Sequence, residues 1–208
     1  MANLSPMMQQ YMRLKEQNPD TLLFFRVGDF YEMFFDDALT ASRELELTLT
    51  GKDCGLAERA PMCGVPHHAV DAYIARLVEK GYRVAIGEQM EDPALAKGLV
   101  DRDVIRIVTP GTLTDSAMIG EKRNNYLCCV CINGKRAGVS FCDVSTGEFS
   151  AQQLPAEPSA LKAALAAMSP GEIITNDVDF VAPCAAIAPH AFTAAAFQAQ
   201  NARETLLK

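Results

Sequence analysis

The sequence predicts an α/β protein in two parts, on the basis of two observations. Up to about residue 112, short apolar runs typical of strands alternate with amphipathic segments typical of helices. After about residue 124, three strand-like runs follow one another and lead into a helix and a short strand. A polar stretch separates the two patterns. We therefore expect a mixed-sheet domain at 1–113, a linker at 114–123 and a second domain at 124–208.

The first elements are delimited by local signals. Ser5-Pro6 suits the start of a helix, because serine accepts hydrogen bonds from free helical N–H groups and proline fits the first turn. Asn18-Pro19-Asp20 ends this helix. The apolar run Leu22–Val27 then predicts a buried strand. Gly28-Asp29 predicts a turn, because glycine tolerates positive φ and aspartate can hydrogen-bond the local backbone.

An aromatic segment follows this turn, at residues 30–35. In an extended segment, Phe30 and Glu32 project to the same side, because they lie two residues apart. They would then form a stacking group beside a hydrogen-bonding carboxylate. In the alternative interpretation, Phe30, Phe34 and Phe35 pack in the core and Glu32 is solvated. The spacing alone leaves both interpretations open.

The rest of the first part continues the alternation of helices and strands. In chain order we expect a helix at 36–45, a half-exposed strand at 45–50, a polar irregular segment at 51–60, a stiff proline-bounded loop at 61–68, a helix at 69–80, a strand at 82–86, a short helix at 94–97 and a strand at 104–108. The expected core positions of the 69–80 helix are Val70, Ile74, Leu77 and Val78. Gly81 would stop this helix, and Pro110-Gly111 fits a type II turn.

The second part has a different order of elements. The expected elements are strands at 126–132, 137–144 and 148–154, a helix at 159–168, a strand at 172–175 and a helix at 198–208. Asn133-Gly134 predicts a two-residue hairpin between the first two strands. A meander followed by a helix and a strand is compatible with a ribonuclease H-like fold. The last helix has no stop signal, which predicts that the chain continues beyond residue 208.

Composition places the chain among ordinary globular proteins. With 208 residues, it can bury a core that needs no disulfides. Its seven cysteines, three of them crowded into one apolar strand, are expected to be reduced and buried, as in the cytoplasm. No run approaches the roughly 20 apolar residues that span a membrane, and the N-terminus lacks a secretion signal. We therefore expect a cytoplasmic, nucleoid-associated location and no membrane partner.

The net charge of −7 argues against a general nucleic-acid binder. Any DNA binding would have to rely on a local basic face, on DNA shape or on further domains.

Metal and nucleotide chemistry receive little support. Cys54 and Cys63 are too far apart for usual zinc spacing, and His67-His68 is more typical of a structural or solvent-facing pair. The sequence has no phosphate-binding loop of the Gly-x-x-x-x-Gly-Lys type. In a ribonuclease H-like nuclease, Asp143 and Glu148 would hold metal ions at strand ends, but the strand at 126–132 carries no carboxylate. In the other interpretation they flank a surface turn.

Four segments, in this order, resemble blocks of the MutS family, the bacterial DNA mismatch-recognition proteins. They are Pro6–Tyr11, Gly28–Phe34, Pro61–Ala69 and Arg106–Thr112. The second half is similar to the connector domain of that family. The resemblance implies a mixed-sheet mismatch-recognition domain followed by part of a ribonuclease H-like connector domain. Cys63 and Gly87 depart from the pattern we expect of the family, but both residues are small.

The resemblance implies a role for the aromatic segment. Phe30 would enter the minor groove and stack on a mispaired or unpaired base, and Glu32 would hydrogen-bond that base. Met62 would line the groove. The possible phosphate contacts are Arg59, Arg76, Lys97 and Arg102. A carboxylate beside DNA is unfavourable, so Glu32 would need a proton or a base donor.

The expected function is recognition of base–base mismatches and small insertion or deletion loops, which initiates DNA mismatch repair without catalysis by this chain. The resemblance implies mismatched duplex DNA as partner, and for the full-length family a homodimer, a MutL-type repair protein, ATP and magnesium. The lever, clamp and ATPase parts are missing, which implies a fragment that carries no cofactor of its own. The alternatives are a metal-dependent nuclease and a protein-interaction module in which Phe30 contacts a partner chain.

Overall fold

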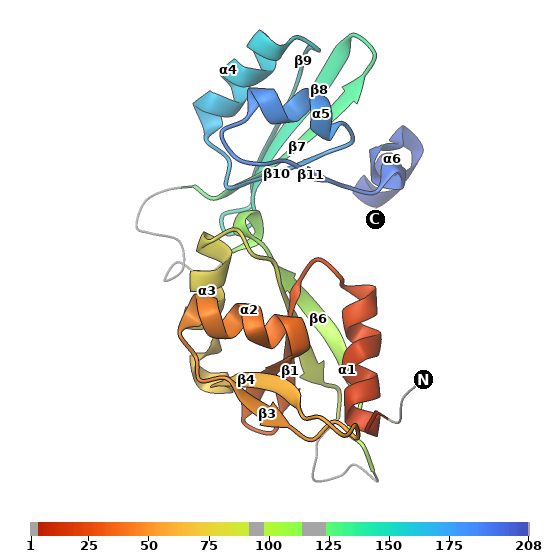
Figure 1. Cartoon of the computed structure of the whole chain (residues 1–208). Coiled ribbons are helices and arrows are strands. Elements are labelled where there is room, and N and C mark those ends of the chain that lie inside the picture. Colours follow the sequence, from red (N-terminus) through yellow and green to blue (C-terminus); the bar gives the residue numbers. More distant parts are fainter. Residues whose placement is uncertain (1–3, 92–97, 114–123, 208) are drawn as a thin grey trace. The chain divides into compact units, whose positions relative to one another are not determined.

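The computed structural model describes residues 4–91, 98–113 and 124–207. The chain divides into two compact units, Met1–Thr109 and Pro110–Lys208 (Figure 1). Each unit has its own mixed sheet with helices packed on it. This agrees with the predicted α/β class. None of the helices in the described part of the chain is long and apolar enough to cross a membrane.

The first unit contains a six-stranded sheet in the order β3-β4-β2-β1-β5-β6. Its strands are β1 (Leu22–Val27), β2 (Phe30–Phe34), β3 (Thr50–Lys52), β4 (Ala60–Pro66), β5 (Val84–Gln89) and β6 (Arg102–Val108). β1 and β5 are parallel, and the other neighbours are antiparallel. The sheet is therefore mixed, and β2 lies in its interior between β1 and β4.

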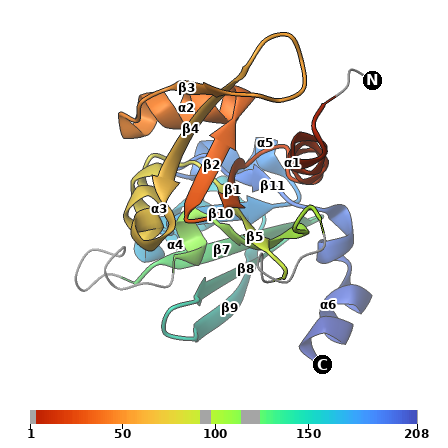
Figure 2. The same cartoon turned by 90° about the horizontal axis from the view of Figure 1, so that it is seen from below.

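Helices cover both faces of this sheet (Figures 1 and 2). They are α1 (Pro6–Gln17), α2 (Phe35–Leu45) and α3 (Val70–Glu79), with the short 3-10 helix η1 (His67–Ala69) before α3. On one face, Tyr11 of α1 packs edge-on against Phe25 and Phe34. On the other face, Cys63 of β4 contacts the Ala38 carbonyl of α2 at 3.5 Å. Alternate residues of the interior strands are therefore buried in two separate layers.

Several predictions in this unit are confirmed and others are wrong, including the irregular segment at 51–60, which contains part of β3. β1 has the predicted bounds, and the predicted core positions of α3 are buried, with Gly81 at φ +86 after the helix. The strand predicted at 45–50 does not form: α2 continues to Leu45, and Glu46 takes the left-handed conformation at φ 59. The leucine alternation there was misleading, because Leu45 is the last buried residue of α2.

The segment predicted as a loop at 61–68 is instead β4 followed by η1. Its prolines lie near the two ends of the strand, where proline is tolerated, and Cys63 and Val65 are buried between them. β4 pairs with the whole of β2 and with β3. The predicted strand at 82–86 begins later, at Val84. The helix predicted at 94–97 lies outside the described residues.

The second unit contains a five-stranded sheet in the order β11-β10-β7-β8-β9. Its elements are β7 (Tyr126–Asn133), β8 (Arg136–Asp143), β9 (Glu148–Pro155), α4 (Pro158–Met168), β10 (Glu172–Thr175), α5 (Val178–Val181), β11 (His190–Ala191) and α6 (Ala199–Leu206), with 3-10 turns η2 (Pro110–Thr112), η3 (Ala182–Cys184) and η4 (Ala194–Phe197). An antiparallel meander, β7 to β9, is extended by β10 parallel to β7. This confirms the predicted ribonuclease H-like class.

Local details of the second unit differ from the prediction. The hairpin is closed by Asn133 paired with Arg136, so the turn residues are Gly134-Lys135. Gly111 lacks the positive φ that a type II turn requires, and Pro110–Thr112 is a 3-10 turn. All seven cysteines are free, but Cys129, Cys131 and Cys142 are half-buried rather than buried.

The boundary between the units falls four residues before the expected end of the first domain at 113. The Gly111 amide donates to Glu172 Oε2 at 3.0 Å, and Asn125 donates to the Pro110 carbonyl at 2.7 Å. These bonds attach η2 to the second unit. The stretch expected as a linker at 114–123 lies outside the described residues.

Candidate nucleic-acid interface

The aromatic segment begins at a tightly fixed hairpin. Val27 pairs with Phe30 across the two-residue turn Gly28-Asp29, and Gly28 has φ +57. The Asp29 carbonyl accepts a hydrogen bond of 2.9 Å from the His67 amide, at the end of β4. The tip that carries Phe30 is therefore held by β1 on one side and by β4 on the other.

Phe30 and Glu32 lie on the same face of β2, as their spacing predicts. Phe30 is 48% exposed, whereas Phe34, two residues beyond Glu32, is fully buried under Tyr11. α1 therefore covers one end of this face and leaves the other end open. The interpretation that placed Phe30 in the core is wrong, while Phe34 is a core residue.

Glu32 is not simply solvated. Its Oε2 lies 2.5 Å from Lys52 Nζ, and only 14% of the Glu32 side chain and 28% of the Lys52 side chain are exposed. The Lys52 ammonium also lies 5.9 Å from the centroid of the Phe34 ring. The sequence alone does not single out Lys52, because β3 reaches Glu32 only through the pairing of β3 with β4 and of β4 with β2.

The backbone of β4 contributes to this arrangement. The residue opposite Glu32 on β4 is Gly64, which has no side chain. A Cβ at that position would lie 3.6 Å from Glu32 Cγ and 3.2 Å from the Tyr31 carbonyl oxygen. Met62, opposite Phe34 on the same strand, is half-buried beside the core cluster of α1. Phe30, Glu32, Met62 and Lys52 thus share one side of the sheet, which we call the recognition face.

Arg102 differs from the expectation of a phosphate contact. It is only 5% exposed, and its guanidinium lies 4.8 Å from the centroid of the Phe25 ring. It donates to the Arg26 carbonyl at 2.6 Å, to the Val100 carbonyl at 2.8 Å and to Gln10 Oε1 at 3.0 Å. Burial lowers the pKa of this guanidinium, and the negative charges of Asp101 and Glu32 oppose that shift. Arg102 therefore acts within the protein interior.

The other expected phosphate contacts are scattered. Arg59 is exposed in the segment before β4, and its side chain lies against Gly51 of β3. Arg76 is exposed on α3, the helix layer on the opposite side of the sheet from the recognition face. Lys97 lies outside the described residues. Of these cations, Arg59 lies in the segment that joins β3 to β4, beside Gly51, whose Cβ direction is opposite to that of its neighbour Lys52.

On the opposite face of β2, Tyr31 makes polar contacts with neighbouring strands. Tyr31 donates a hydrogen bond to Glu88 of β5, and Arg26 Nη1 lies 3.5 Å from Glu88 Oε1. Burial, followed by the hydrogen bond to Glu88, raises the pKa of Tyr31 to about 12. This contact joins β2 to β5 across β1, so the strand that carries Phe30 is fixed from behind.

The carboxylates considered for a nuclease have structural partners. Asp143 is 1% exposed and accepts hydrogen bonds from Ser145 Oγ at 2.6 Å and from the Asn125 amide at 3.1 Å. These bonds, chiefly the one from Ser145, lower the pKa of Asp143. Glu148 accepts from Asn124 and Tyr126. Asp143 thus organises the turn between β8 and β9, and Glu148 joins the start of β9 to the start of β7.

The described residues contain no group of three His, Cys, Asp or Glu side chains placed to hold a metal ion. Cys54 and Cys63 instead contact backbone carbonyls of Glu58 and Ala38. Burial raises the pKa of Cys63 to about 11. The Cys54 and Cys63 thiols therefore have separate surroundings.

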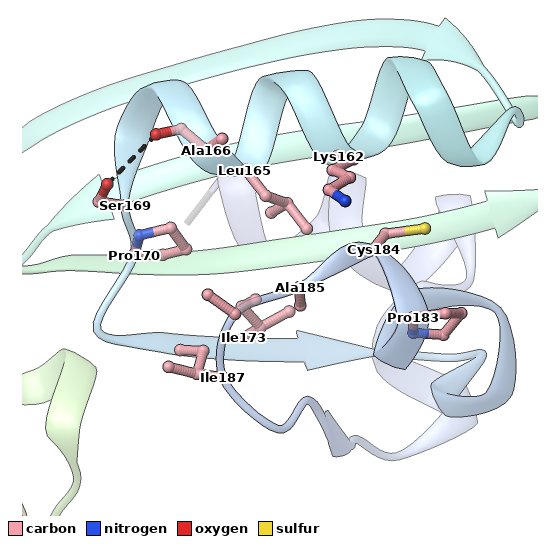
Figure 3. A pocket seen from close by; sticks show the side chains of 11 residues that line it. Lys162, Leu165, Ala166, Ser169, Pro170, Ile173, Pro183, Cys184, Ala185 and Ile187 are labelled. Carbon is pink, nitrogen blue, oxygen red and sulfur yellow. Dashed lines mark hydrogen bonds between the residues drawn. The ribbon is translucent and has the colours of Figure 1, made fainter.

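The second unit has a cavity of about 490 Å³ between α4 and the segment after η3 (Figure 3). Leu165, Ile173 and Ile187 form much of its wall, and Lys162 is the charged residue among those that line it. Apolar walls with a single charged group suit packing or an apolar ligand, and they do not supply an acid–base pair. This cavity gives no support to a catalytic function.

Comparisons with known proteins point to one family. The family model described as MutS domain I matches residues 5–117, and the model described as MutS domain II matches residues 125–183. The chain is 62% identical over 178 residues to the DNA mismatch repair protein MutS of Acetivibrio thermocellus, which covers 85% of this chain and 20% of that protein.

Two further relatives give the same result. The MutS proteins of Ruminiclostridium cellulolyticum and Clostridium tetani are 59% and 54% identical to the chain, over 85% of it and 20% of each relative. The chain thus spans about a fifth of the length of the curated relatives it matches. The model of MutS domain I alone matches more than half of the residues of this chain, so the chain belongs to the MutS family.

Proposed function

We propose that this chain recognises base–base mismatches and small insertion or deletion loops in duplex DNA, as the initiating step of mismatch repair. The observation that carries the proposal is the half-exposed Phe30 on a fixed hairpin, beside a carboxylate on the same strand face. Phe30 enters the minor groove and stacks on the mispaired or unpaired base. Glu32 accepts a hydrogen bond from that base.

The energetics favour a mismatch over a matched pair. A wedge must unstack a base step and kink the duplex, which costs a few kcal/mol. A mismatch already has weakened pairing and stacking, so the same deformation costs less there. Stacking on Phe30 returns about 1–3 kcal/mol. Specificity then follows from how easily the DNA deforms and does not require a particular base sequence.

A rigid support makes such a wedge effective. The hairpin of Phe30 is tied to β4 through the His67 amide, and Tyr31 is hydrogen-bonded to Glu88 behind it. A ring held in this way loses little conformational entropy on insertion. Met62, opposite Phe34 on β4, lines the groove further along the same face. Arg59 supplies a phosphate contact that positions the duplex without reading bases.

Two of the cations expected from the sequence have no part in the proposal. Arg102 is buried, and Arg76 projects from the opposite helix layer. With a net charge of −7, these 208 residues bind DNA weakly by themselves. Strong binding needs contacts from further domains or from a second subunit, which raise the effective concentration of this face at the DNA.

We also propose where and with which partners the chain acts. The chain acts in the cytoplasm at the nucleoid, as part of a homodimer that binds a MutL-type protein. ATP and magnesium are used by other domains of that protein, and the two units described above catalyse no reaction.

The test is binding of G·T and single-base-loop duplexes against matched duplex, at one stated salt concentration. It uses the intact native protein that contains this chain and its Phe30→Ala variant. We expect Phe30→Ala to abolish the preference for the mismatch with the circular dichroism spectrum unchanged. Phe149→Ala is the matched control, because Phe149 is an even more exposed phenylalanine in the second unit.

An unchanged mismatch preference in Phe30→Ala would remove the wedge from the proposal. If the same substitution instead disrupted a protein complex, the interaction-module alternative would replace it. Cleavage of labelled duplex by this chain with magnesium or manganese, abolished by Asp143→Asn, would support the nuclease alternative.

A further inference from the structure

We propose that Lys52 is a positioning residue of the recognition face: it holds Glu32 toward the DNA and compensates its charge, so that a carboxylate can enter the minor groove. This inference rests on the proposed function and assigns a role to a residue outside the aromatic segment. Lys52 lies on β3, two strands away from Glu32 on β2.

The ion pair is largely covered by protein. The 2.5 Å contact between Lys52 Nζ and Glu32 Oε2 joins side chains that are 28% and 14% exposed. Exposed ion pairs are weak because water and salt screen them, whereas covered pairs are coupled more strongly. Removing one partner of a covered pair leaves the other charge uncompensated. The position of Glu32 therefore depends on Lys52.

A second cation cannot take the place of Lys52. Arg102 lies over Phe25, the residue that pairs with Glu32 on β1, and the negative charge of Glu32 acts on it. However, the Arg102 guanidinium is tied to Gln10 and to the carbonyls of Arg26 and Val100. It is buried and cannot follow Glu32 toward a ligand. Lys52 is the partner that makes direct contact.

The Lys52 ammonium also has N–H donors that the ion pair with Glu32 does not use. Within the described ranges, Glu32 is the one hydrogen-bond acceptor of the Lys52 ammonium, which has three N–H donors. The free donors can be directed at a base edge or a backbone oxygen while the ion pair stays intact. The pair would then present a carboxylate acceptor and an ammonium donor side by side.

The charge balance gives the physical reason for such a pair. The minor groove has a negative potential, so an isolated carboxylate is repelled from it. A neutral Lys52–Glu32 pair avoids most of that repulsion and keeps the carboxylate as an acceptor. A mispaired or unpaired base presents a Watson–Crick-edge donor to this acceptor, whereas in a matched pair that donor is engaged with the partner base. Lys52 is thus expected to act on mismatch preference through Glu32.

A double-mutant cycle tests this in the intact native protein. The variants are Lys52→Met, Glu32→Gln and the double substitution, each measured on G·T and matched duplexes. We expect Lys52→Met to reduce the ratio of mismatch to matched affinity about tenfold, which corresponds to the loss of one charge-assisted hydrogen bond. In the Glu32→Gln background, the same substitution should leave the ratio unchanged.

Two further variants distinguish positioning from a structural role. Lys52→Arg keeps the charge and should restore the mismatch preference, whereas Lys52→Gln should not. Lys80→Met is the matched control, because Lys80 pairs with Glu44 at 3.1 Å on the α2 and α3 layer, away from the recognition face. If Lys52→Met fails to fold, as judged by thermal melting, the Gln and Arg variants carry the test.

Three outcomes would overturn the inference. Lys52→Met could leave both affinities unchanged, or lower both equally, or lower the ratio additively with Glu32→Gln. The second outcome would indicate a general phosphate contact, and the third a contact of Lys52 that does not act through Glu32. The Phe30→Ala measurement distinguishes a failure of the proposed function from a failure of this inference. If Phe30→Ala removes the mismatch preference but the Lys52–Glu32 cycle shows no coupling, the proposed function stands and this inference fails.

Discussion

Tyr11 of α1 donates a hydrogen bond to Asp37 of α2, with 3.0 Å between Tyr11 Oη and Asp37 Oδ2. Asp37 also accepts from Lys15 Nζ at 2.8 Å and from the Leu23 amide at 2.9 Å. One carboxylate therefore joins α1, β1 and α2. Phe30 is the first residue of β2, and α2 follows directly after the last residue of that strand. The Asp37 carboxylate therefore fixes the C-terminal end of β2.

Tyr11→Phe should destabilise the first unit by about 1–3 kcal/mol, because the buried Asp37 carboxylate loses one of its three donors. Burial, followed by the nearby charge of Asp37, raises the pKa of Tyr11 well above its ordinary value, so the hydroxyl stays a donor. Urea unfolding followed by circular dichroism measures the change. Tyr73→Phe, at a half-buried tyrosine on α3, should have little effect, and equal losses for the two variants would contradict the role of Asp37.

Gly111→Ala should destabilise the second unit by about 1–3 kcal/mol, the usual range for overpacking. A Cβ at Gly111 would lie 2.9 Å from Glu172 Cβ and 3.1 Å from Leu127 Cα, in the turn that attaches η2 to the sheet. Gly138→Ala is the matched control, since its nearest neighbour would be 3.9 Å away. Equal thermal midpoints for the two variants would show that η2 can move aside at no cost.

Acid should weaken the second unit through Asp143. Hydrogen bonds, first from Ser145, lower the pKa of this carboxyl in the folded state below its value in the unfolded chain. Its contribution is therefore fully present above about pH 4, the ordinary aspartate pKa, and is lost as pH falls through the lower folded pKa.

Asp143→Asn should lower the urea midpoint at pH 7 and should flatten the loss of stability below pH 4. Urea titrations of both proteins at several pH values measure this. Parallel acid profiles for the two proteins would mean that another group controls the loss.

Two thiols should resist alkylation in the native protein. Burial raises the pKa of Cys63 to about 11 and that of Cys128 to about 12, and only the thiolate is an efficient nucleophile. At pH 8, iodoacetamide should leave both unmodified until urea unfolds the chain. Peptide mass spectrometry before and after unfolding reads this out. Rapid native labelling at Cys128 would contradict the closed core between the β7–β8 sheet and α4.

Arg59→Gln should weaken binding to matched and mismatched duplexes equally. Loss of one phosphate contact reduces the slope of log affinity against log salt by about 0.9. The equivalent substitution Arg76→Gln should change neither affinity nor slope, because Arg76 lies on the opposite helix layer. Fluorescence anisotropy at several salt concentrations separates the two. A larger effect of Arg76→Gln would place the duplex against α3 and would contradict the proposed recognition face.

Local sequence signals determined much of the fold. The apolar run of β1, the short strand β10 and the buried positions of α3 were predicted with their correct residues, because each depends on neighbours within a few positions along the chain. The side of β2 shared by Phe30 and Glu32 also follows from strand alternation alone. The assignment of those two residues to DNA recognition came from the resemblance to the family.

Only the tertiary structure decided which side chains meet. The leucine alternation at 45–50 fits an exposed strand as well as a helix end, and the burial of Leu45 in α2 selects the second. The pairing of β4 with both β2 and β3 places Lys52 in contact with Glu32, although the two residues are 20 positions apart in the sequence. The burial of Arg102 likewise depends on Phe25 and Gln10, which are distant along the chain. Periodicity specifies the face of each strand, whereas the neighbours on that face depend on strand order, which no local pattern encodes.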